Sequence, residues 1–324
     1  LFTILGKWDI RAGDSDHLSI RSFYTKNETV GFTGGRGQNQ IQASFGNTEA
    51  FENSGHNTVA TWNKVFEGGN KFNEMKVMYY DSTRPRQPVN PGVPEINIGD
   101  TGNFGQRFFL PIDGDQEKIT FQNNFQVAFG NHDMKFGADI NAYSTRNNLF
   151  FGWSAGEYRF ATLEDFEAGQ PFALIQGFGF GAPYEEAALQ PERSRQTGYG
   201  AYFQDKWQAK PNVTVTYGLR WDGTENPDPI SPIGGEMVPA GVGQSTRLVA
   251  PPQRTPSDWD QWGPRAGVAW SFDMAGKPAV LRANTGLYYA QTPPIFLNTG
   301  SGPTTVVFCF FNSACLPPGG YPNL

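Results

Sequence analysis

The chain has 324 residues and a net charge of −6, and it contains no lysine- or arginine-rich run, which excludes a surface built to bind nucleic acid. Its mean hydropathy is −0.48 and no stretch of about 18 apolar residues occurs, which excludes a membrane-spanning helix. Aromatic residues make up 15% of the chain, a share typical of β-rich proteins with aromatic belts.

Alternating apolar and polar residues, separated by turn residues, predict ten β-strands. In chain order these strands cover residues 3–12, 17–26, 57–66, 71–82, 117–130, 133–147, 195–208, 212–223, 263–273 and 278–290. In the eighth strand one face carries Val213, Val215, Tyr217, Leu219 and Trp221. These lengths suit a bilayer, because a tilted membrane strand needs about 9–11 residues.

The connections between these strands alternate strictly between short and long. Short turns are predicted at 12–16, 67–70, 131–132, 209–211 and 274–277, and long connections at 27–56, 83–116, 148–194, 224–262 and after 290. Membrane barrels combine short periplasmic turns with long extracellular loops. The predicted fold class is therefore all-β, an antiparallel transmembrane β-barrel, with one short helix near 163–168 that Thr162 caps.

One hairpin resembles the barrel hairpin of TonB-dependent outer-membrane receptors, and it reads Tyr202-Phe-Gln-Asp-Lys-Trp-Gln-Ala-Lys-Pro-Asn-Val-Thr-Val-Thr-Tyr-Gly-Leu-Arg-Trp-Asp222. Residues 16–24, 262–270 and 280–289 are similar to segments of the Oar-like branch of these receptors. The resemblance implies a barrel of about 22 strands in the bacterial outer membrane, plugged by an N-terminal globular domain. It also implies energy-coupled uptake through a TonB-type inner-membrane protein.

Ten strands are under half of such a barrel, and no plug domain is recognisable in the sequence. We therefore expect residues 1–324 to form a partial outer-membrane barrel without a separate domain, as an internal piece of a longer protein. The partners that the resemblance implies are outer-membrane lipid, the plug domain, the TonB-type protein and a ligand such as a sugar, a peptide or a metal chelate.

Polar residues on the inward strand faces are the first candidate site: Gln204, Lys206, Arg220, Asp222, Arg282 and Asn284. Neighbouring strands favour cross-strand ion pairs between Gln204 or Lys206 and Arg220 or Asp222. The same side chains can satisfy one another in a wet interior or hold the plug.

Aromatic residues in the long connections are the second candidate site: Phe150, Phe151, Trp153, Tyr158, Phe178 and Phe180. These rings can stack on a ligand, since binding residues often lie on loops of a rigid scaffold, or they can bury one another. Cys309 and Cys315 can form a local disulfide or stay as two thiols.

No catalytic, cofactor or metal site is assigned. His17, His56 and His132 are expected to be solvated loop residues, and no nucleophile elbow, zinc-protease motif or P-loop occurs. The acidic segment 113–117, and Asp222 with Glu225 and Asp228, suggest a cation site, but the spacing of a calcium-binding loop is absent.

We therefore expect a transporter barrel rather than an enzyme. A soluble or surface-attached carbohydrate-binding β-protein, a barrel hydrolase and a structural barrel without transport remain alternatives.

Overall fold

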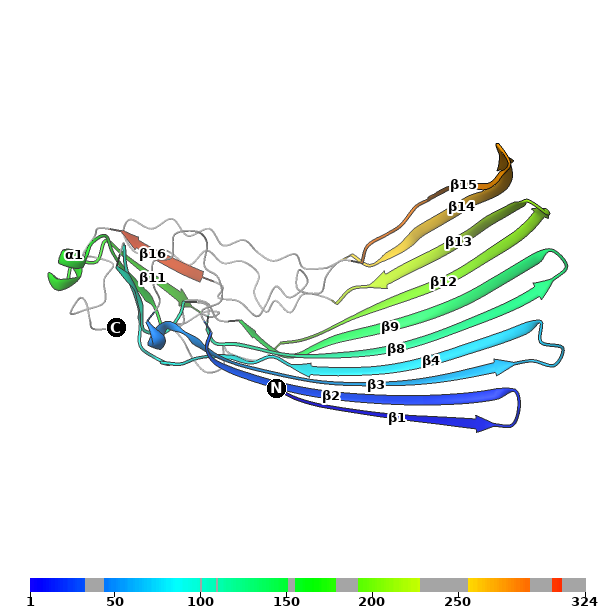
Figure 1. Ribbon diagram of the computed structural model, residues 1–324. Coiled ribbons are helices and arrows are strands. Elements are labelled where there is room, and N and C mark those ends of the chain that lie inside the picture. The colour runs from blue at the N-terminus through cyan, green and yellow to red at the C-terminus, as the bar shows by residue number, and fades with distance from the viewer. Residues whose placement is uncertain are drawn as a thin grey trace.

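The computed structural model describes residues 1–32, 44–99, 101–108, 110–150, 155–178, 192–227, 256–291 and 305–310. They form two β-sheets, one large and one small, with almost no helix (Figure 1). All ten predicted strands are present in the large sheet, so the predicted fold class is confirmed.

The large sheet is antiparallel throughout, and its main path follows chain order. Its strands are β1 (Phe2–Ala12), β2 (Asp16–Phe32), β3 (Glu49–Val65), β4 (Lys71–Thr83), β8 (Ile112–Phe129), β9 (His132–Phe150), β12 (Glu192–Lys210), β13 (Val213–Glu225), β14 (Asp258–Met274) and β15 (Lys277–Gly286). A short strand, β5 (Arg86–Pro88), pairs with β3 and β8. Within the described residues the sheet is open, with β1 and β15 at its edges.

Tight turns join the strands at one end of the large sheet, at the right of Figure 1. Between β8 and β9 the turn uses Gly130 with φ of 59°, a left-handed conformation that glycine adopts without a steric penalty. At the other end the strands are longer than the sequence predicts, and β9 and β12 each have 19 residues. Because a membrane crossing needs about 9–11 residues, these strands continue past the apolar region at that end.

The two faces of the large sheet differ in chemistry. The register aligns Phe136, Phe203 and Leu219 in one row, so these side chains share a face, which we call the apolar face. Large apolar residues on this face are not covered by other parts of the described chain. The solvent-exposed fraction is 41% for Phe136 and 42% for Leu219. The opposite face, which we call the polar face, carries Arg220 and Asp139.

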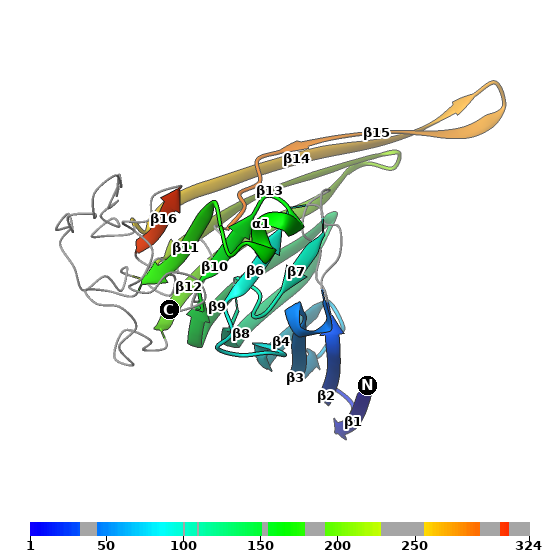
Figure 2. The ribbon, with the colours of Figure 1, turned by 90° about the vertical axis from the view of Figure 1, so that its left-hand side faces the viewer.

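The small sheet is built from the long connections, and it lies at the end of the large sheet away from the tight turns (Figures 1 and 2). Its strand order is β16 (Thr305–Phe310), β11 (Ala173–Phe178), β10 (Glu157–Phe160), β6 (Glu95–Ile98) and β7 (Gly102–Phe104). Only the β6–β10 pair is parallel. These segments are predicted as loops from the sequence, because strands of three to six residues are too short to show a period.

The buried hydrophobic cluster of the described chain lies in the small sheet and not in the large one. Ile98, Tyr158, Phe160 and Leu174 pack together, and each is at most 6% exposed. The helix α1 (Leu163–Glu167) adds Phe166, whose ring meets Phe160 edge-on at 5.2 Å. The predicted helix is thus confirmed, including Thr162 as its N-cap, which forms a capping box with Asp165.

Buried polar contacts attach the small sheet to the first residues of β3. Asn47, in the short 3₁₀ helix Phe45–Asn47, donates from Nδ2 to Glu95 Oε1 at 3.2 Å. The Ser44 amide donates to the Asn103 carbonyl at 2.9 Å. Beside these contacts, within the large sheet, Glu49 of β3 is fully buried and pairs with Arg86 of β5 at 2.8 Å. The small sheet is therefore fixed to the rim of the large one.

No helix in the described ranges is long and apolar enough to cross a membrane.

The separate core of the small sheet leads to a stability prediction. Phe160→Ala should destabilise the small sheet by about 3–5 kcal/mol, because it leaves a cavity among fully buried side chains. Hydrogen exchange should then accelerate in β10 and β11 and stay slow in β12 and β13. Leu163→Ala, at a side chain that is 43% exposed, is the matched control and should change neither region. Equal acceleration in both sheets would contradict separate cores.

Candidate functional site

The polar face carries an ion-pair cluster centred on Arg220. Its guanidinium donates to Asp222 Oδ1 on the same strand at 2.7 Å and to Asp139 Oδ1 on β9 at 3.0 Å. The Arg220 and Asp139 side chains are 24% and 16% exposed. This partial burial makes the pairs stronger than fully exposed ones, which contribute little.

Hydrogen bonds extend this cluster across neighbouring strands. Asn141 donates from Nδ2 to Asp139 Oδ2 at 2.9 Å, and Thr120 donates to Asn141 Oδ1 at 3.0 Å. The polar face of β9 is therefore linked to that of β8.

A second chain of hydrogen bonds spans four strands, from β12 across β9 to β8 and β4. The Tyr202 hydroxyl on β12 donates to Asn124 Oδ1 on β8 at 2.7 Å. Asn124 in turn donates to Glu74 Oε1 on β4 at 3.2 Å, and Lys76 lies 3.5 Å from Glu74. The two chains together cover the polar face from β4 to β13.

Two glycines make room for these long-range contacts. Gly200 lies between Asp222 and Asp139 in the register, and an added Cβ there would collide with the Arg220 guanidinium and lie 2.7 Å from Asp139 Oδ1. At Gly137 an added Cβ would collide with the Tyr202 ring. Arg220 and Tyr202 can each pass over a neighbouring strand because that strand has no side chain at the crossing point.

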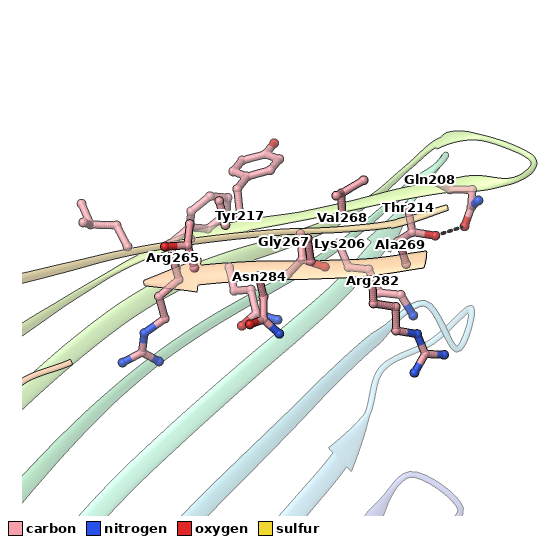
Figure 3. Close-up of a pocket in the computed structure, with 18 of the residues that line it drawn as sticks. Lys206, Gln208, Thr214, Tyr217, Arg265, Gly267, Val268, Ala269, Arg282 and Asn284 are labelled. Carbon is pink, nitrogen blue, oxygen red and sulfur yellow. Dashed lines mark hydrogen bonds between the residues drawn. The ribbon is translucent and has the colours of Figure 1, made fainter. Parts of the chain in front are cut away.

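A hollow of about 810 Å³ lies beside this network, over β12 to β15. Figure 3 shows Lys206, Arg265, Arg282 and Asn284 extending into it from one side of the sheet, while Tyr217 and Val268 extend to the other side. Thr214 donates to Gln208 Oε1 at 3.0 Å at its edge. The polar face is thus the concave side of the sheet.

All six polar residues singled out from the sequence lie on the polar face. Their predicted pairing was wrong, however, because the register places Gln204 opposite Gly218 and Lys206 opposite Thr216. Among the described residues, Arg220 pairs with Asp222 and Asp139, and neither Gln204 nor Lys206 joins it. Arg282 and Asn284 line the hollow.

The predicted ligand-contacting aromatics have different outcomes. Tyr158 is fully buried beside Phe160, which rules out ligand contact by its ring. For this residue the second alternative, in which the aromatic rings bury one another, is correct. Phe150 and Phe178 end β9 and β11, but their side chains lie outside the described residues, as do Phe151, Trp153 and Phe180. For these five residues the prediction stays untested.

The backbone of Cys309 lies in β16, in register with Leu174 of β11. Cys315 lies outside the described residues, so the disulfide prediction also stays open.

All three histidines lie in strands, so their expected place in solvated loops was wrong. His17 is the second residue of β2 and lies 3.3 Å from Asp9, and His56 in β3 is hydrogen-bonded to Ser22 and Thr58 at 3.0 Å. His132 is the first residue of β9, and its Nδ1 lies 2.6 Å from Asp205 Oδ2. Long strands that start immediately after short turns place these residues inside the hydrogen-bonded ladder.

The suggested cation sites gain no support from the geometry. In the described ranges no group of three or more His, Cys, Asp or Glu side chains is arranged to hold a metal ion. Asp222 is engaged by Arg220, and the Tyr199 hydroxyl donates to Glu225 at 3.4 Å. Asp228 lies outside the described residues.

Seven members of the polar network were not predicted from the sequence: Asp139, Asn141, Thr120, Asn124, Tyr202, Glu74 and Lys76. Alternation alone would have assigned Asp139 and Asn124 to inward faces of their strands. No sequence signal identifies Tyr202 as a partner of Asn124, because that contact depends on the register and on Gly137.

A protein-family model, described as an outer membrane beta barrel domain, matches residues 2–315. The chain belongs to this family. It is therefore an outer-membrane β-barrel protein, and the apolar face of its large sheet is the surface that contacts lipid.

Solved structures with a similar fold include the outer membrane transporter YddB from Escherichia coli, with 13% identity, a TM-score of 0.47, and coverage of 87% of this chain and 39% of that one. The open form of the ferric-catecholate import receptor Fiu from E. coli K12 has 11% identity and a TM-score of 0.48, with 90% and 47% covered. The chain thus spans less than half the length of either structure. No curated protein sequence matches the chain.

The glycine at the crossing point leads to a testable prediction. Gly200→Ala should destabilise the barrel by about 1–3 kcal/mol, because the methyl group displaces Arg220 from Asp139 and leaves partly buried charges unpaired. The measurement is urea unfolding of the barrel in detergent micelles. Gly267→Ala is the matched control, since its nearest contact would be 3.4 Å and its stability should stay unchanged. Equal stabilities of the two variants would show that the Arg220 cluster contributes little.

The two faces of the sheet should respond differently to a new charge. Leu219→Arg, on the apolar face, should cost about 2–4 kcal/mol, because the guanidinium enters hydrocarbon. Gln204→Arg, exposed on the polar face of the adjacent strand, should change stability by less than about 0.5 kcal/mol. Unfolding in phospholipid vesicles measures both, and a reversed order would mean that the faces are assigned the wrong way round.

Proposed function

We propose that this outer-membrane barrel is the pore wall of a TonB-dependent receptor of the Oar-like branch, which captures a ligand at its extracellular end and imports it. The observation that carries the proposal is the polar face with its five-strand network of charges and amides. A sheet that packed a dry core would bury apolar side chains on this side instead. Charged and amide side chains suit a wet passage, or a surface that contacts a plug.

The small sheet supports capture of a ligand at the outer end. Long connections of outer-membrane barrels are extracellular, and here they fold into a packed sheet fixed to the rim by Asn47 and Ser44. A rigid scaffold with its own core can hold exposed side chains in fixed positions for binding. The ligand is a sugar, a peptide or a metal chelate.

Energy coupling and the plug belong to the same proposal. The hollow of about 810 Å³ beside Arg282 and Asn284 is a concave polar surface that a plug domain of the receptor can fill. A TonB-type inner-membrane protein then supplies the energy for ligand release.

As part of this proposal, the barrel has no enzymatic activity. Arg220, Asp139 and Asp222 are engaged with one another, as expected for side chains that line the wall of a passage. A structural barrel without transport is the remaining alternative.

An uptake experiment tests the proposal. A strain that lacks the gene, and the same strain with the full gene restored, are grown on media containing sugars, peptides and metal chelates, and depletion of each class is measured by mass spectrometry. Restoring the gene should restore depletion of one class, and deletion of the TonB-type partner or a protonophore should abolish it. Equal depletion by both strains would favour the structural barrel, and depletion without the partner would remove energy coupling from the proposal.

Two further variants of the restored gene connect uptake to the small sheet. Phe160→Ala removes a buried ring there and should lower depletion. Phe136→Ala removes a ring of the same size from the apolar face and should leave depletion unchanged.

A further inference from the structure

A buried carboxylate lies on the apolar face, where lipid is the neighbour. Asp205 shares this face with Phe203 and Trp207, because the three residues alternate along β12. It is nevertheless only 1% exposed. A charge in an apolar region is costly unless it is paired and hydrogen-bonded, so the groups around Asp205 have to compensate for it.

Residues on three adjacent strands supply this compensation. Asp205 Oδ2 accepts hydrogen bonds from His132 Nδ1 on β9 at 2.6 Å and from the Tyr217 hydroxyl on β13 at 2.8 Å. The His132 ring lies flat against Trp207, with ring centroids 5.8 Å apart and planes 2° from parallel. Asp205 thereby fixes both the position and the orientation of the imidazole.

The same arrangement determines which imidazole nitrogen of His132 is left at the surface. Nδ1 is engaged by the Asp205 carboxylate 2.6 Å away. An imidazolium has two N–H donors, and Asp205 uses one of them. Within the described part of the chain, Nε2 makes no hydrogen bond, and the His132 side chain is 38% exposed. In its doubly protonated form the ring therefore presents Nε2 as a donor at the surface.

The location determines which anion can reach this donor. His132 begins β9 directly after a short turn, and short turns of such barrels are periplasmic. Further along the apolar face, the exposed ring of Phe136 packs against the half-buried ring of Phe203, with centroids 5.1 Å apart. An imidazole nitrogen at the edge of an apolar surface thus lies at the level of the headgroups of the periplasmic leaflet.

We propose that His132, held by Asp205, Tyr217 and Trp207, binds the phosphate of a phospholipid headgroup in the periplasmic leaflet, with the acyl chains over Phe136 and Phe203. His132 recognises the phosphate group. This phosphate belongs to a lipid and is not free in solution, because His132 lies on the lipid-facing side of the sheet. The proposal rests on the position of the barrel in the membrane and not on transport.

The chain provides a matched control on the other face. His17 also lies at the start of a strand after a short turn, as the second residue of β2, and near an aspartate, Asp9, but on the polar face. His17→Gln therefore removes the same chemistry at the same end of the sheet without touching the lipid surface.

The test measures lipid binding to the complete receptor in detergent by native mass spectrometry. Phosphatidylglycerol is the probe, diacylglycerol with the same acyl chains lacks the phosphate, and inorganic phosphate lacks the acyl chains. His132→Gln should weaken phosphatidylglycerol binding roughly tenfold, the effect of losing one charged hydrogen bond. His17→Gln should bind like the wild type, and diacylglycerol binding should be the same in all three proteins.

Three results would overturn the proposal: unchanged phosphatidylglycerol binding by His132→Gln, an equal loss for diacylglycerol, or full displacement of the lipid by an equal concentration of inorganic phosphate. A measurement on the wild type keeps the test decisive if His132→Gln fails to assemble. Phosphatidylglycerol with a photoreactive acyl chain should label peptides that contain Phe136 or Phe203 above all others. Uniform labelling around the barrel would also reject the site.

Discussion

The structure depends on one constraint, which is that every backbone amide and carbonyl group at membrane depth must be hydrogen-bonded within the protein. Ten antiparallel strands meet this requirement through continuous ladders between neighbours from β1 to β15, leaving only the outer edges of β1 and β15 unpaired within the described residues. The side chains of these strands are then free to divide by alternation into an apolar face toward lipid and a polar face toward the interior. The buried hydrophobic cluster lies elsewhere, in the small sheet, because the barrel wall has lipid on one side and a polar interior on the other.

Charges on the two faces are handled in different ways. On the polar face Arg220 shares its charge with Asp222 and Asp139 across a glycine, and amides and a tyrosine carry the network to neighbouring strands. On the apolar face Asp205 is screened from lipid by His132, Tyr217 and Trp207, so that a polar group at the membrane border is compatible with an otherwise apolar surface. The first arrangement supports the proposed pore wall, and the second provides the proposed headgroup site.

Much of the fold could be predicted from the sequence, because membrane strands are long enough for a two-residue period to be visible. The alternation of Val213, Val215, Tyr217, Leu219 and Trp221 places these residues on the apolar face. The same parity places Gln204, Lys206, Arg220 and Asp222 on the polar face. The small sheet could not be predicted in this way, since β6, β7 and β10 have three or four residues each and pair with segments far along the chain.

By itself the sequence determined the ten long strands of the large sheet, their tight turns and the capped helix. It also determined which side chains of these strands share a face. All of these features follow from local periodicity and turn chemistry. Only the tertiary structure decided which side chains meet. Arg220 reaches Asp139 and not Lys206 because of the register and of Gly200, and His132 leaves its expected loop to join Asp205 because β9 begins at that residue. The burial of Tyr158 was also decided by the tertiary structure, because its neighbours Ile98 and Leu174 come from other strands of the small sheet.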